Sequence, residues 1–257
     1  MNPPENFLMK LHRSLVEAGV NPYRASAVAT FITQCYDLLL SAHHALVQPT
    51  RWRQFCATRG ATTKRRRATA APANISETAI TAHLSSEAQR LLLERGGVET
   101  LVPGISIACV IADHTAPSDI ATGSSSKRPD LVFFPADPAL QLQFAMEAKV
   151  IRLATDIAND LLGEAGFGCF VRAIDPYETN GVVGLLGYVE PVQTIAMMNE
   201  TESFMKADVR FTQVGAQDLV VNAKGPNHQP RTVVGHIANA GPKVCIASML
   251  AVELTTL

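Results

Sequence analysis

Residues 128–151 read RPDLVFFPADPALQLQFAMEAKVI and combine two apolar runs with three charged side chains near their ends. Two apolar runs flank the turn-forming segment Pro135–Pro138, which predicts two antiparallel strands or two strands that lie close together. Side chains two positions apart share one face of a strand. Glu147 and Lys149 therefore point to the same face near the end of the second strand, while Asp130 opens the first. The stretch predicts three charged side chains on two neighbouring strands.

The chemistry of these three side chains suggests a metal site. Charged groups on an apolar strand are costly to bury without a function. Asp130 and Glu147 can hold a hard divalent cation such as Mg²⁺ or Mn²⁺. Lys149 can orient or deprotonate a water beside that cation, because the positive charge of the cation would lower the pKa of the lysine amine. The ammonium can also stabilise developing negative charge. The alternative is a surface hairpin with a cross-strand ion pair, worth at most about 1 kcal/mol.

The pattern Pro129-Asp130, sixteen further residues, then Glu147-Ala148-Lys149 resembles the PD-(D/E)xK signature of the restriction-endonuclease-like nuclease superfamily. The resemblance implies an α/β fold with a central mixed β-sheet flanked by helices. It implies Asp130, Glu147 and the main-chain carbonyl of Ala148 as metal ligands, and Asp130, Glu147 and Lys149 as catalytic residues. The activity that it implies is Mg²⁺-dependent endonucleolytic hydrolysis of phosphodiester bonds in DNA.

A predicted helix over residues 74–96 offers a further acid. Asn74 is the expected N-cap, with Glu77 in a capping-box position. Both Glu77 and Glu87 fall on the apolar stripe of this helix. The text ISETAITAHL resembles the E-x-x-I-T-x-x-L pattern of nucleases from bacterial defence systems, which implies Glu77 as a catalytic residue and metal ligand. Glu87 is the second candidate, and a structural capping role for Glu77 stays open.

Residues 48–72 are basic and contain no acid. Such a stretch can neutralise phosphates of a nucleic-acid backbone, with Trp52 available for stacking on a base. A solvated linker is an equally supported alternative. A second basic group stands just before Asp130. The residues expected to contact nucleic acid are Arg51, Arg53, Lys64, Arg65, Arg66, Arg67, Lys127, Arg128 and Arg172.

The remaining elements follow from periodicity and turn residues. Two helices are expected within residues 5–47, separated at Asn21-Pro22. We expect an N-terminal helical hairpin and basic linker over residues 1–72, and a nuclease-like domain over residues 73–257. Further strands are expected over Ile105 to Ala112 and Gly181 to Val189. Further helices are expected from Leu153 to Leu162 and over residues 191–206. The last apolar run, Val244 to Leu254, is expected to close the sheet or to pack a helix against it.

The order of segments after Lys149 also resembles the defence nucleases. A Gly-rich helix start, a Phe-Val pair, a tyrosine and a Gly-Tyr-Val strand follow one another. Cys169 stands where a basic residue is expected before Phe-Val, and Arg172 comes after it. The role of Arg172 is therefore open, with contact to substrate as one interpretation for Arg172 and Tyr177.

Composition sets wider bounds. The net charge of −1 over 257 residues argues neither for nor against nucleic acid. Five scattered cysteines without zinc-ligand spacing favour reduced thiols and a cytoplasmic protein. No signal peptide and no apolar run of about 18 residues is found, so no membrane span is expected.

By resemblance, the role is anti-phage defence, with a partner ATPase or helicase subunit. The competing hypothesis is a non-catalytic nucleic-acid-binding or assembly subunit on the same fold. RNA as substrate, sequence specificity, the number of metal ions and a homo-oligomer are left open.

Overall fold

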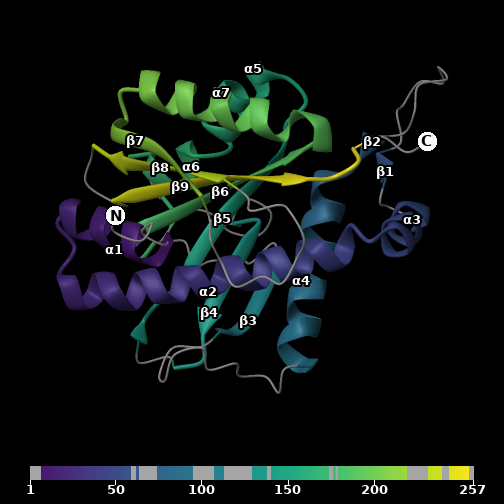
Figure 1. Ribbon diagram of the computed structural model, residues 1–257, viewed down its shortest axis with the longest axis horizontal. Helices are drawn as coiled ribbons and strands as arrows, with labels where there is room; N and C mark the ends of the chain where they lie inside the picture. Colours follow the sequence, from purple (N-terminus) through teal and green to yellow (C-terminus); the bar gives the residue numbers. More distant parts are fainter. Residues whose placement is uncertain are drawn as a thin grey trace, which may run out of the picture.

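The protein is a mixed α/β structure in which a seven-stranded sheet lies between two helical layers (Figure 1). The computed structural model describes residues 7–58, 62–63, 74–94, 107–112, 129–137, 140–173, 176–177, 179–218, 231–238 and 243–254. Within these ranges no helix is both long and apolar enough to cross a membrane.

The large sheet is antiparallel at both edges and parallel in the middle. The predicted hairpin is confirmed, because the strand that follows Asp130 pairs antiparallel with the strand that carries Glu147, with Leu131 opposite Met146. The next two strands inward are parallel to it. In spatial order the strands are β3 (Ile107–Ala112), β4 (Leu131–Pro135), β5 (Phe144–Val150), β6 (Val182–Val189), β9 (Val244–Ala251), β8 (Arg231–Ile237) and β7 (Phe211–Asp218).

Helices cover both faces of this sheet (Figure 1). One layer holds α1 (Phe7–Glu17), α2 (Pro22–Leu46) and α4 (Glu77–Glu94). The other holds η3 (Ile157–Leu161), α6 (Gly168–Val171) and α7 (Thr194–Ala207). The smaller elements are α3 (Pro49–Ala57), α5 (Ala154–Asp156), η4 (Pro191–Gln193) and the two-stranded pair β1 (Thr62–Thr63) and β2 (Asn74–Ile75).

Alternation along β5 assigns its side chains to the two layers. Met146 and Ala148 belong to the hydrophobic cluster shared with α2 and α4. Ala145 belongs to the cluster shared with η3 and α7, and so does Ile151 just beyond the strand. Because successive side chains on a strand point to opposite faces, Glu147 shares the second face with Ala145, and Lys149 follows it there. The strand therefore carries its two charged groups on one face, as predicted.

The N-terminal helical hairpin is confirmed, and it packs on the sheet. Asn21 caps α2, because its side-chain oxygen accepts from the main-chain amide of Tyr23 at 3.0 Å, and Pro22 occupies the first turn. Tyr36 is buried against the Phe144 ring, with 5.8 Å between ring centroids, and accepts a hydrogen bond from Ser248 at 3.0 Å. These contacts join α2 to β5 and β9 in one core.

Two segments differ in detail from the sequence-based expectation. The last apolar run forms β9, which lies inside the sheet between β6 and β8. The helix expected after Lys149 is a short α5 followed by the π-helical turn η3. The glycines that follow are required sterically, since a Cβ at Gly163 would lie 1.8 Å from the Asn159 carbonyl oxygen and one at Gly166 2.1 Å from that of Leu161.

Candidate functional site

Three carboxylates surround the Lys149 ammonium at the end of β5. Its Nζ atom lies 3.1 Å from Glu147 Oε2, 3.5 Å from Asp130 Oδ2 and 3.6 Å from Glu77 Oε1. The same nitrogen donates to the main-chain carbonyl of Ala148 at 2.9 Å. Four oxygen atoms from α4, from the residue before β4 and from β5 thus converge on one positive charge. The structure brings together Asp130, Glu147, Glu77 and the Ala148 carbonyl, which the sequence analysis gave as metal ligands.

The four charged side chains of the cluster differ in their exposure to solvent. The side chain of Glu147 is 5% exposed and that of Lys149 is 14% exposed. Those of Asp130 and Glu77 are 29% and 34% exposed. A ligand from solvent therefore reaches the Glu77 and Asp130 side first, and Glu147 forms the floor.

Main-chain amides of β5 hold two of the acids in place. Strand β4 begins at Leu131, so the amides of Ala148 and Val150 lie beyond its last pair with β5. Asp130 Oδ2 accepts from the Ala148 amide at 2.8 Å, and Glu77 Oε2 accepts from the Val150 amide at 2.9 Å. The carboxylates thus satisfy donors that a longer β4 would have paired.

The start of α4 directs Glu77 toward the strand. The predicted N-cap is wrong: Asn74 lies in β2, and the Ser76 hydroxyl accepts from the Ala79 amide at 3.4 Å. Glu77 is therefore the first helical residue, and one of its carboxylate oxygens bonds to β5. The Glu77 main-chain carbonyl accepts a hydrogen bond from the Thr81 hydroxyl at 3.0 Å, and the Thr81 hydroxyl lies 2.9 Å from that of Tyr188. These hydrogen bonds link α4 to β6.

Electrostatics favour a neutral Glu147 and a charged Lys149. Burial raises the pKa of Glu147 to about 9, with hydrogen bonding to Asp130 and the charge of Asp130 in the same direction and Lys149 opposing. Burial lowers the pKa of Lys149, but the charges of Glu147, Asp130 and Glu77 outweigh it and hold that pKa above its ordinary value. The amine is accordingly a poor base while the acids surround it.

Cys169, Arg172 and Tyr177 contact one another on the face of the sheet that carries Glu147. Burial raises the pKa of the Cys169 thiol, and the charge of Glu147 adds to the effect. The Tyr177 amide donates to the Cys169 carbonyl at 2.9 Å. The exposed Arg172 guanidinium stacks over the Tyr177 ring at 5.6 Å from its centroid. Arg172 therefore offers a solvent-facing cation that is packed against Tyr177.

Other predicted residues lie elsewhere. Glu87 is paired with Arg51 and Arg90, and hydrogen bonding from Arg90 lowers its pKa. Between the two helix-borne acids, only Glu77 joins the Lys149 cluster. The exposed Arg53 donates to the Pro49 carbonyl in its own helix at 3.1 Å.

The basic stretch of residues 48–72 is described only in part. The prediction that Trp52 is available for stacking on a base is wrong, because it is 6% exposed and packs against Phe55 in α3. Phe55 in turn contacts the His83 ring of α4. Lys64, Arg65, Arg66, Arg67, Lys127 and Arg128 lie outside the described residues.

Sequence reasoning missed the supports of the cluster. The amide donors at Ala148 and Val150 carry no residue-specific signal. Tyr188 did carry one, since a tyrosine hydroxyl in an apolar strand needs a buried partner. Thr81 supplies that partner.

Within the described residues no group of three His, Cys, Asp or Glu side chains is placed to hold a metal ion. The acids are arranged around the Lys149 ammonium instead. Comparison of the chain with protein-family models, with curated proteins and with solved structures found no match.

Proposed function

We propose that the protein is a metal-dependent nuclease that hydrolyses phosphodiester bonds of DNA, on a restriction-endonuclease-like core. One observation carries the proposal. Acids from three separate elements and one main-chain carbonyl converge on a single cation, the Lys149 ammonium. Concentrating acids at one point raises the free energy of the fold unless a cation compensates them, so the arrangement favours a cation-binding role.

The donor set fits a divalent cation such as Mg²⁺ or Mn²⁺. All four donors are oxygens, which hard cations prefer. Asp130, Glu147, Glu77 and the Ala148 carbonyl are the groups that would hold it. When bound, the ion supplies Lewis acidity and a water of lowered pKa. A cation at this position requires the ammonium to move away from the acids.

Lys149 then has a different partner. Released from the acids, its amine can donate to an attacking water or to a phosphate oxygen, and stabilise the negative charge that develops there. Glu147 must lose its proton before it can act as an anionic ligand, because burial and Asp130 raise its pKa. The Asp130 and Glu77 carboxylates keep their orientation through the amides of β5.

The outer rim supports a phosphate-bearing substrate. Arg172 is exposed and stacks on Tyr177, which packs on the face of the sheet that carries Glu147, so its guanidinium is oriented before a ligand arrives. A guanidinium binds phosphate oxygens in a paired geometry. DNA as substrate, a role in anti-phage defence and a partner ATPase or helicase rest on the resemblance of the sequence to defence nucleases.

Plasmid nicking tests the proposal. Wild-type protein is incubated with supercoiled DNA in Mg²⁺ or Mn²⁺ and, separately, in EDTA. We expect nicking only with metal, and its loss in Asp130→Asn and Lys149→Met. Glu94→Gln is the matched control, because this acid is 58% exposed on α4 and pairs with Arg90 away from the cluster. Metal-independent DNA binding without nicking would refute the enzyme and favour a non-catalytic binding subunit.

A further inference from the structure

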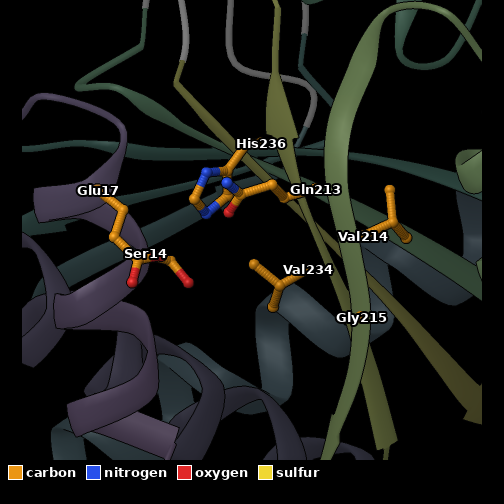
Figure 2. A pocket seen from close by; sticks show the side chains of 7 residues that line it. All are labelled: Ser14, Glu17, Gln213, Val214, Gly215, Val234 and His236. Atoms are coloured by element: carbon orange, nitrogen blue, oxygen red, sulfur yellow. The ribbon is translucent and has the colours of Figure 1, made fainter.

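A small polar cavity lies between the end of α1 and the strands β7 and β8 (Figure 2). Ser14 and Glu17 of α1 face Gln213 of β7 and His236 of β8, and Val234 forms part of the floor. Its volume is about 220 Å³. That is below the roughly 300–1,000 Å³ typical of drug-sized ligands, and equals about seven water volumes. The cavity therefore suits a compact molecule.

The cavity is separate from the Lys149 cluster. His236 lies opposite Val244, which lies opposite Val182 at the start of β6, whereas Lys149 lies opposite Gly187. Three strand spacings and about five residues along the strands separate the two sites, or about 20 Å. Val234 belongs to the cluster on the α1 and α2 face, so the side chain of His236, two residues on, shares that face. The cavity and the Lys149 cluster thus lie on opposite faces.

Two largely buried side chains present polar atoms to the cavity. His236 is 9% exposed and Ser14 is 8% exposed. No hydrogen bond joins either side chain to any group in the described part of the chain, although both line the cavity (Figure 2). Polar atoms that face a cavity and have no protein partner are available to water or to a bound ligand. The cavity offers a ligand these unmet hydrogen bonds.

The charge of the lining selects the kind of ligand. Among the residues that the structure describes, Glu17 is the only formally charged one that lines the cavity, and it is also the last residue of α1. The C-terminal end of a helix carries a partial negative charge, and the last turn of α1 has no basic residue. Burial lowers the pKa of His236, against the charge of Glu17, so its ring does not neutralise that acid. The lining therefore favours a cation and disfavours an anion such as a nucleotide.

We propose that this cavity is a binding site for a small organic cation, an alkylammonium or alkylguanidinium group, held by Glu17 at the rim and by Ser14, Gln213 and His236. The cation pairs with the Glu17 carboxylate. Its remaining N–H groups donate to the Gln213 amide oxygen, the Ser14 hydroxyl and the acceptor nitrogen of His236. Such a ligand joins α1 to the β7–β8 edge of the sheet.

One position allows the cavity to be closed without disturbing the core. Gly215 lies opposite Val234 in the β7–β8 pair, and side chains of opposed residues share a face. A Cβ at Gly215 would meet nothing within 4 Å. Leu or Val at this position therefore extends into the cavity.

The test uses the full-length protein and a matched pair of probes. Butylguanidinium and butylurea have nearly the same shape, but only the first is charged. Binding is measured by isothermal titration calorimetry and by the rise in melting temperature. Wild-type protein is expected to bind butylguanidinium saturably with one site, and butylurea at least about tenfold more weakly.

Variants separate this site from the rest of the protein. Glu17→Gln is expected to weaken butylguanidinium binding about tenfold, and Gly215→Leu to abolish it. Gly215→Val repeats the second test if the leucine variant is not folded by circular dichroism. Asp130→Asn is expected to bind like the wild type. Absence of saturable binding to the wild type, or equal binding by the Glu17 and Gly215 variants, would overturn the proposal.

Discussion

Replacing Glu147 by Gln tests the central electrostatic claim about the Lys149 cluster. Burial and the neighbouring Asp130 raise the pKa of Glu147 from 4.5 to about 9. In the unfolded chain the same group ionises near its ordinary pKa. Between these two values the folded protein holds a proton that the unfolded chain has lost. The stability of the wild type must therefore fall as the pH rises through this window, whereas the amide side chain of the Glu147→Gln variant cannot titrate.

Linkage sets the size of the effect. A difference of one bound proton changes the free energy of unfolding by about 1.4 kcal/mol for each pH unit. From pH 6 to pH 8, both within the window, the wild type should lose up to about 3 kcal/mol relative to Glu147→Gln. Lys149 does not alter this slope, because its pKa lies above the window. The free energy of unfolding of the variant, measured relative to that of the wild type, should therefore increase as the pH rises.

Urea denaturation at several pH values in EDTA measures this difference. Each protein is unfolded at pH 6, 7 and 8, and the free energies of unfolding are subtracted, which cancels the groups that the two proteins share. Glu94→Gln is the control, and its curve should run parallel to that of the wild type. Parallel curves for Glu147→Gln as well would show that Glu147 is ionised in the folded state, and the argument from burial and Asp130 would be refuted.

Three further results are expected. Affinity for Mn²⁺, measured by calorimetry, should rise up to about tenfold per pH unit below pH 9, because the ion must displace the proton of Glu147. Arg172→Ala should weaken DNA binding in gel-shift titrations and reduce the slope of log K against log salt by about one, if Arg172 contacts a phosphate. Gly187→Ala should lose about 1–3 kcal/mol in urea unfolding, since its Cβ would lie 2.1 Å from Met249 Sδ, whereas Gly215→Ala should not.

Much of the local structure around the cluster could be predicted from sequence. Period-two alternation was sufficient to place Glu147 and Lys149 on one face of a strand, and the Pro-rich turn was sufficient to pair that strand with the one after Asp130. Helical periodicity located α4 and brought Glu77 into consideration. These features depend on neighbours in sequence, where spacing determines geometry directly.

The parts that could not be predicted depend on contacts between distant segments. The insertion of β9 between β6 and β8 is a choice among strand pairings that periodicity does not rank. The basic residues around Trp52 predict a surface ring, yet α3 turns it toward Phe55 in the core. The cavity at His236 requires α1 to meet strands that begin about two hundred residues later in the chain.

The early end of β4 determines what holds the Asp130 and Glu77 carboxylates in place. If β4 began a few residues earlier than Leu131, its carbonyls would accept hydrogen bonds from the amides of Ala148 and Val150, as in a regular ladder. Asp130 and Glu77 take these donors instead. Their orientation is therefore fixed by the backbone of β5, not by the ion pair with Lys149. If the ammonium moved away, the Asp130 and Glu77 carboxylates would lose their counter-charge but keep their positions. An exchange of the ammonium for a divalent ion would require carboxylates that stay in place in this way.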